Sequence, residues 1–217
     1  MKVDRFLRPE DLAAVEAAVR DAETASGGEI VPYVVDASDA YPGSLWTGAA
    51  WGAVGAPLAA AALFAGLDPW GGWPLWMTLP PLAGAAAGWL AARWSEPLRR
   101  ALVPAAVAER RVEQRAATAF LDEEVFLTRE RTGVLLFVSL FEHRVVVLAD
   151  AGIHRRVPAG AWDAVVAEAV AGLRAGKHGT SLVEAVRRIG ELLAAHGVPR
   201  AAGDTDELTD RVRREER

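Results

Sequence analysis

Two groups of polar residues stand at the ends of predicted strands, where their side chains could do chemistry. The first group combines two carboxylates, an arginine, a threonine and a histidine: Glu29, Arg131, Thr132, Asp150 and His154. The second group is smaller and lies at the opposite strand ends: Asp36, Asp39, Glu142 and His143. Carboxylates contributed by separate segments suit a hard cation such as Ca²⁺ or Mg²⁺. We therefore expect metal ligands at Asp150 and Glu29, with Asp36 and Asp39 as weaker candidates.

Both groups also have simpler interpretations. Arg131 could orient a phosphate bidentately, or it could form an ion pair with Asp150 that closes the sheet edge, leaving His154 exposed. Carboxylates near strand ends, such as Asp36, are common on protein surfaces. The sequence has no Cys–Arg loop, no Asp-x-Asp-x-Thr/Val and no Arg-His-Gly signature, and its four histidines are scattered. No catalytic residue can therefore be assigned.

The elements that would position these residues follow from hydrophobic periodicity and from breaks at glycine and proline. A helix is predicted over 9–26, where Leu12, Val15, Val19 and Ala22 form an apolar stripe that ends at Gly27 and Gly28. Apolar runs predict three strands, at 29–35, 133–139 and 144–148. Charged or amphipathic stretches predict three further helices, at 99–124, 159–174 and 180–195, and Thr180 caps the last of them. The chain ends in a polar tail at 204–217.

The order of these elements predicts an α/β fold with a small mixed sheet. The first strand reaches the second through a helical crossover, so the two should be parallel. The second and third strands should form an antiparallel hairpin. Helices are then available for both faces of the sheet.

Two uncharged stretches interrupt this domain. No charged residue occurs from Ala40 to Leu67 or from Pro69 to Ala92, and seven of the eight tryptophans lie between Trp46 and Trp94. Each stretch exceeds the ~20 residues that a helix needs to cross a bilayer. We expect a transmembrane helical hairpin at 45–92 inside a discontinuous domain of 1–39 and 96–210, followed by a polar tail at 211–217. The alternative is a pair of buried, alanine-rich helices.

Charge distribution and composition suggest a location and exclude some partners. Arginines follow the second stretch and none lies in the turn, which predicts a two-pass protein of the cytoplasmic membrane with both termini and the α/β domain in the cytoplasm. The expected partners are the lipid bilayer and a membrane protein. A net charge of −5 without a clustered basic face argues against nucleic acid. Absence of cysteine is compatible with a reducing compartment, and no organic cofactor or signal peptide is indicated.

Four short motifs in order resemble the TPM domain family, the thylakoid-phosphatase-like membrane-associated domains. Glu23-Thr24 with Gly28-Glu29-Ile30 resembles the family's entry motif, and Asp150-x-Gly152-Ile153-His154 resembles its "G-D-x-G-I-H". The other matching positions are Thr128, Arg131 and Gly133 of "T-x-x-R-N-G-V-L", Trp162, and Glu207 with Asp210 of the terminal "N-E-L-P-D". The chain departs from the family at Thr132 and Asp206, where asparagines are usual, and at Ala149, where glycine is usual.

The resemblance implies an α/β sandwich of the TPM type. It also implies three associations of the family: acid phosphatase activity in a plant photosystem-repair protein, binding of calcium or magnesium, and modulation of membrane complexes. From these we expect a membrane-anchored, divalent-metal-binding interaction or regulatory module that acts on a membrane-protein partner. A metal-dependent acid phosphatase is the alternative.

Overall fold

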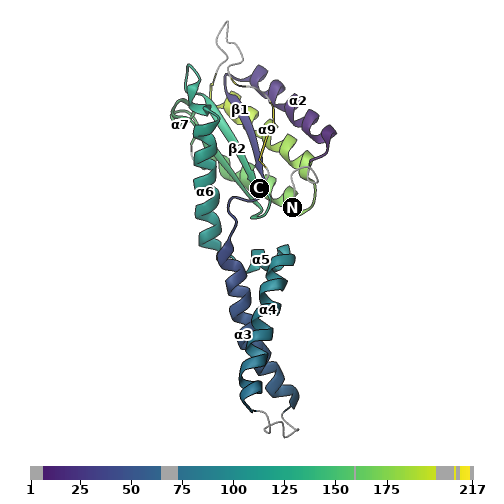
Figure 1. The fold of residues 1–217 in the computed structure, drawn as a ribbon. Coiled ribbons are helices and arrows are strands. Elements are labelled where there is room, and N and C mark those ends of the chain that lie inside the picture. Colours follow the sequence, from purple (N-terminus) through teal and green to yellow (C-terminus); the bar gives the residue numbers. More distant parts are fainter. Residues whose placement is uncertain (1–6, 65–72, 159, 199–207, 209–210, 216–217) are drawn as a thin grey trace. The chain divides into compact units, whose positions relative to one another are not determined.

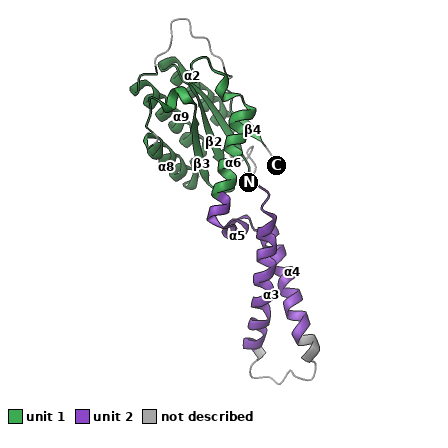
Figure 2. Ribbon diagram, turned by 90° about the vertical axis from the view of Figure 1, so that its left-hand side faces the viewer, with its two compact units in different colours: residues 1–38, 109–217 green, residues 39–108 purple. Residues whose placement is uncertain are grey.

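The chain divides into two compact units, one formed by residues 1–38 with 109–217 and the other by residues 39–108 (Figure 2). The structure, a computed structural model, describes residues 7–64, 73–158, 160–198, 208 and 211–215. Its elements follow one another in this order: α2 (Pro9–Ala25), β1 (Glu29–Val35), α3 (Pro42–Phe64), α4 (Trp73–Trp94), α5 (Glu96–Ala101), α6 (Ala105–Asp122), the 3₁₀ helix η2 (Val125–Leu127), β2 (Gly133–Ser139), β3 (Arg144–Ala149), α7 (Ala151–His154), α8 (Ala161–Arg174), α9 (His178–Ala195) and β4 (Arg213–Glu215).

The first unit is built on a mixed four-stranded sheet with the order β3-β2-β1-β4. β1 is parallel to both β2 and β4, while β3 is antiparallel to β2. The parallel pairing of β1 with β2 and the β2–β3 hairpin confirm the mixed α/β architecture expected from the order of elements. Pro32 has no N–H to donate, and β4 pairs with β1 only beyond it, from Tyr33 to Val35.

The two faces of the sheet carry separate apolar cores. Because side chains alternate along a strand, Ile30 and Val34 face the core shared with α2, α8 and α9. Tyr33 and Phe137 face the core shared with α6, with their rings stacked at a centroid distance of 5.8 Å. Figure 1 shows α6 on one side of the sheet and α2 and α9 on the other. The expected coverage of both faces is therefore present.

Several elements differ from the pattern predicted by the sequence. The expected helix over 99–124 is two helices, α5 and α6, because Pro104 stands between them. α9 begins at His178, and its N-cap position is Lys177 rather than Thr180. Arg213–Glu215 forms β4, where a polar tail is predicted.

The second unit contains the helical hairpin α3–α4, whose helices pack through glycine. A Cβ placed on Gly48, Gly52, Gly84 or Gly88 would lie closer than 3.0 Å to the backbone of the facing helix. Only glycine permits this close approach between the two backbones. These four glycines are thus used for packing between α3 and α4.

The prediction that this hairpin crosses a membrane is wrong. Within the described ranges, no helix combines the length and the apolar character that a membrane crossing requires. The physical reason is composition: α3 is 23 residues long, yet leucine, valine and phenylalanine fill only five of its positions, and the rest are mostly alanine and glycine. α4 carries Pro80 and Pro81 in its interior. The two-pass topology in the cytoplasmic membrane, with termini and α/β domain in the cytoplasm, is overturned by the same finding.

Candidate functional site

The strand register brings the first group of predicted site residues to one end of the sheet. Glu29 opens β1 opposite Gly133, the first residue of β2. Ala149 closes the antiparallel β3 opposite Val134, so Asp150 follows at the same end. Asp150 is 5% exposed and Thr132 is 4% exposed, so both lie inside the protein.

Asp150 is held by a bidentate ion pair. Nε of Arg131 donates to Oδ2 at 2.6 Å and Nη2 donates to Oδ1 at 2.9 Å. The N–H of Ala151 also donates to Oδ1 at 2.6 Å, which makes Asp150 the N-cap of α7. The hydrogen bond to Asp150 raises the pKa of Arg131 above its ordinary value. The guanidinium stays half exposed and lies over the ring of Phe126, 5.9 Å from its centroid.

The backbone around this pair ties the two central motifs together. Arg131 has a positive φ of 58°, and its carbonyl accepts the N–H of Gly152 at 2.9 Å. A Cβ on Gly152 would collide with the carbonyls of Glu130 and Arg131, so only glycine fits. Thr128 Oγ1 accepts the N–H of Thr132 at 2.9 Å. These motif residues therefore have definite roles in closing the turn before β2 onto α7.

Glu29 and His154 are also engaged in contacts of the fold. Oε2 of Glu29 accepts the N–H of Leu208 at 3.3 Å, which places the described part of the terminal motif at this end of the sheet. His154 is exposed, and its Nδ1 lies 3.0 Å from the carbonyl of Ala149. Asp206, Glu207 and Asp210 lie outside the described residues.

The described residues contain no group of three or more His, Asp or Glu side chains placed to hold a metal ion. Asp150 gives both of its oxygens to Arg131 and Ala151, so a cation there would have to displace the guanidinium. The geometry matches the alternative interpretation, an ion pair at the sheet edge. A metal site at Glu29 and Asp150 stays a prediction.

The opposite end of the sheet holds a closed polar cluster that the sequence did not predict. Ser38 Oγ donates to Ser139 Oγ at 2.9 Å, and the N–H of Ser38 donates to Oε1 of Glu142 at 2.9 Å. Ser139 Oγ donates to Oε2 of Glu142 in a very short contact. Ser139 is fully buried, so the hydroxyl is not accessible as a nucleophile. A serine that ends an otherwise apolar strand was the available sequence signal.

The weaker metal candidates do not assemble around this cluster. Asp36 is buried, and its carbonyl accepts the N–H of Phe141 at 2.9 Å. Asp39 belongs to the other unit, where its carboxylate accepts the N–H of Ala40 at 2.6 Å. His143 adopts a positive φ of 50° in the turn between β2 and β3. Trp162, the second residue of α8, is buried in the core on that side of the sheet.

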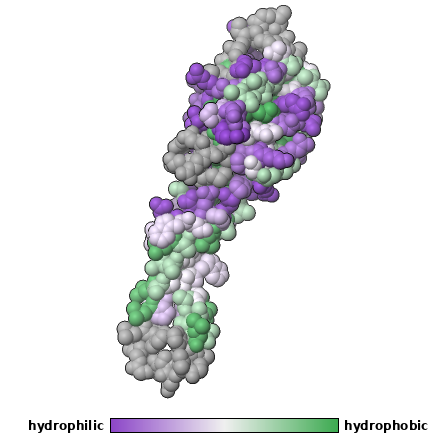
Figure 3. All heavy atoms as spheres, turned by 90° about the vertical axis from the view of Figure 1, so that its right-hand side faces the viewer, coloured by the Kyte–Doolittle hydropathy of each residue, from purple (hydrophilic) through white to green (hydrophobic). Residues whose placement is uncertain are grey.

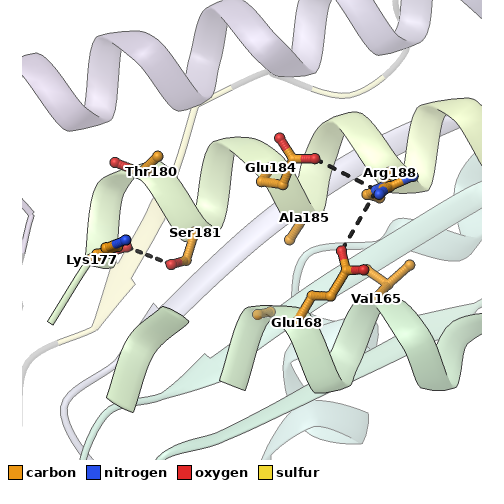
Figure 4. Close-up of a pocket in the computed structure, with 9 residues that line it drawn as sticks. Val165, Glu168, Lys177, Thr180, Ser181, Glu184, Ala185 and Arg188 are labelled. Carbon is orange, nitrogen blue, oxygen red and sulfur yellow. Dashed lines mark hydrogen bonds and ion pairs between the residues drawn. The ribbon is translucent and has the colours of Figure 1, made fainter. Parts of the chain in front are cut away.

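A small pocket of about 210 Å³ lies between α8 and α9 (Figure 4). Its acidic and basic groups neutralise each other, since Arg188 lies 3.6 Å from Glu168 and 3.5 Å from Glu184. Ligand pockets usually have volumes of about 300–1,000 Å³ and aim a few polar groups at one ligand. This pocket is smaller, and both of its glutamates lie within ion-pair distance of Arg188.

The helices α3 and α4 present an apolar surface, which we call the hairpin surface. Nine large apolar side chains of α3 and α4 are exposed, with exposed fractions between 57% and 78%: Trp46, Trp51, Val54, Leu58, Leu63, Met77, Leu79, Leu82 and Trp94. Figure 3 shows apolar and weakly polar side chains along the described part of this unit, whereas the other unit presents many hydrophilic ones. Among the positions of α3 and α4 whose burial the structure describes, the buried ones are small: Ser44, Gly48, Gly84 and Ala92.

Comparison with known proteins bears on the fold of the chain and does not indicate an activity. No protein-family model matches the chain, and no curated protein matches it. Among solved structures, the chain is similar to the NMR structure of the BA42 protein from the psychrophilic bacterium Bizionia argentinensis, with a TM-score of 0.60 and 19% sequence identity over 99% of each chain. At this level of identity the likeness concerns the fold alone.

Proposed function

We propose that this protein is a non-catalytic binding module, in which an α/β domain of the TPM type carries an apolar helical hairpin that contacts a partner protein. The observation that carries the proposal is the hairpin surface, with nine large apolar side chains turned outward. Exposed apolar area of this extent is typical of an interaction site.

The positions of small and large side chains in the hairpin support binding of a partner protein, beyond what its total hydrophobicity indicates. In a water-facing helical hairpin, large apolar residues pack between the helices and polar residues face outward. Here glycine and alanine lie between the helices, and Trp51 and Leu58 point away from the packed face. α3 has no charged residue, and Arg93 is the one charged residue of α4. Helices that are apolar all round are stable when covered.

The polar side chains of the α/β domain support a role other than catalysis, because they are engaged in contacts within the fold. A phosphatase needs a nucleophile or a metal-activated water together with charge stabilisation of the transferring phosphoryl group. The carboxylate of Asp150 is committed to Arg131 and to the N-cap of α7. The buried hydroxyl of Ser139 is committed to Glu142. Neither group is free to attack a substrate.

The assignment to the TPM type rests on the agreement between motif residues and their structural roles. Thr128, Gly133 and Gly152 match the family's motifs, and each stands where the turn before β2 or the start of α7 requires that residue type. A residue pattern that builds a turn supports a shared fold and does not imply a shared reaction.

Site-specific photo-crosslinking of the full chain tests the proposal. A benzophenone amino acid at Leu58 or Leu82 should give discrete adducts with a protein, because both positions lie on the hairpin surface. The matched control is Leu127, which is 59% exposed but belongs to η2 in the α/β unit.

Adducts at all three positions, or at none, would contradict the proposal. Turnover of p-nitrophenyl phosphate that is lost in Asp150→Asn would favour the acid phosphatase instead. Heat from a Ca²⁺ or Mg²⁺ titration that disappears in the same variant would restore the predicted metal site.

A further inference from the structure

We infer that the partner of the hairpin surface is a second copy of this chain, so that α3 and α4 of two molecules pack into one assembly of four helices. This inference rests on the binding function proposed above and names its partner. It follows from the size of the surface, from its lack of charge and from the pattern of small and large side chains on it.

The size of the hairpin surface fits a stable dimer. The nine side chains are exposed by 57% to 78%. Since a tryptophan carries about 150–250 Å² and the six aliphatic side chains carry somewhat less, together the nine expose on the order of 1,000 Å². A standard protein interface buries about 800 Å² per partner. The total is comparable with that area, so a dimer of this size would use most of the hairpin surface.

The chemistry of the surface favours a copy of itself. Interfaces between unlike proteins that also exist separately are only about as apolar as the rest of the protein surface, whereas homodimer interfaces are more apolar and carry fewer charges. α3 has no charged residue that would select an oppositely charged partner or repel a like one. In a two-fold dimer the same patch lies on both sides of the interface, so a surface without charge is complementary to itself.

The hairpin also has the shape that such packing needs. Four of its glycines are already used between α3 and α4 of one molecule, where a Cβ on Gly52 or Gly84 would meet the facing backbone. The large side chains, including Trp51 and Leu58, are left for the outer faces. Large side chains on facing helices can interdigitate and fill the interior of a four-helix assembly.

Sedimentation of the full chain tests the inference directly. The chain has a mass of 23.1 kDa, and we expect a species of twice that mass at micromolar concentration. Trp51→Glu with Leu58→Glu should give the single-chain mass, because two charges would be buried in the interface. Leu127→Glu places a charge on an equally exposed apolar residue outside the hairpin and should leave the dimer intact.

Chemical cross-linking gives a second readout that does not depend on disrupting the interface. The chain has no cysteine, so a single introduced thiol is the one reactive site. Leu58→Cys treated with a bismaleimide should yield a product of two chains, and Leu127→Cys should not. Circular dichroism of each variant verifies that it is folded.

The outcomes separate this inference from the proposed function. A single-chain mass for the unmodified protein, with photo-adducts at Leu58 to a different protein, would overturn the inference and leave the binding function standing. A single-chain mass without any adduct would overturn both. Capture of the single chain by phosphatidylcholine vesicles, with Leu58 shielded there, would also overturn both.

Discussion

The α/β unit and the hairpin unit bury opposite kinds of side chains. In the α/β unit the largest residues, such as Phe137 and Leu136, are fully buried. In the hairpin unit Gly48 and Gly84 are buried, whereas Trp46 and Trp51 are about 70% exposed. Most large apolar side chains described in the first unit are covered within it, Leu121 and Leu127 being exposed exceptions. The second unit is internally well packed and still leaves most of its large apolar side chains uncovered, so packing quality alone does not show that a unit is finished.

Truncating a leucine in each unit should reveal this difference most strongly. Leu136→Ala removes a fully buried side chain and should lower the free energy of unfolding by about 2–5 kcal/mol. Leu58→Ala removes a side chain that is 66% exposed and should change the stability of the single chain by about 0.5 kcal/mol or less. Urea unfolding at a concentration where the chain is monomeric measures both. An equally large cost at Leu58 would show that this side chain is covered within one chain.

Glycine substitutions test whether the hairpin is held by close helix approach. Gly52→Ala places a Cβ against the carbonyl of Gly84 and should destabilise the hairpin by about 1–3 kcal/mol. Gly55 is the matched control, since a Cβ there has nothing within 4 Å. Gly55→Ala should instead stabilise α3 by about 0.5–1 kcal/mol. Hydrogen exchange of the backbone amides along α3 distinguishes the Gly52→Ala variant from the Gly55→Ala variant. Equal amide protection in both variants would contradict the glycine packing.

The ion pair at the sheet edge gives a smaller effect. Asp150→Ala leaves the N-cap of α7 unfilled and should lower the free energy of unfolding by about 1–2 kcal/mol. The loss stays in this range because water can solvate the half-exposed guanidinium of Arg131. Arg131→Ala should cost at least as much, because it leaves the buried carboxylate of Asp150 without its counter-charge. The double variant should cost less than the sum of the two. Chemical unfolding of the three variants measures the coupling. Additive costs would mean that the two side chains do not depend on each other.

The smallest expected effect is a pH dependence at the start of α9. Burial lowers the pKa of His178 from its ordinary value of 6.5, against the opposing effect of the nearby Asp11 carboxylate. The unfolded chain therefore binds a proton at a higher pH than the folded one. Stability should fall as the pH drops below about 6.5. His178→Gln should reduce the dependence of stability on pH, measured by thermal unfolding between pH 7 and pH 5. An unchanged dependence would show that other titratable groups cause it.

Most of the sheet could be predicted because its strands are apolar runs with clear ends. The strands 29–35 and 133–139 and their parallel pairing follow from local patterns and from the crossover between them. β4 could not be predicted, since Arg213–Glu215 has no apolar pattern. It is held by contacts with distant residues: Arg213 pairs with Glu123 at 2.8 Å, and Tyr33 Oη donates to Glu215 at 3.0 Å.

The candidate site was predictable only in part, for related reasons. The sequence correctly offered an Arg131–Asp150 ion pair as one alternative, because strand order places the two residues at one sheet end. The cluster of Ser38, Ser139 and Glu142 was missed, since it depends on a contact between residues 101 positions apart. The hairpin was predicted from its lack of charge, but lack of charge alone did not separate a membrane crossing from a surface of small and apolar side chains.

The long separation between β1 and β2 has a consequence for the order in which the chain folds. Glu29 pairs with Gly133, 104 positions later, whereas Gly52 and Gly84 of the hairpin are only 32 positions apart. Contacts between near neighbours in the chain form faster than contacts that must close a long loop. During synthesis β1 therefore leaves the ribosome before β2 has been made, and the hairpin can fold before β1 pairs with β2. We expect the inserted unit to be the first part of this protein to fold, and the domain that surrounds it to be completed afterwards.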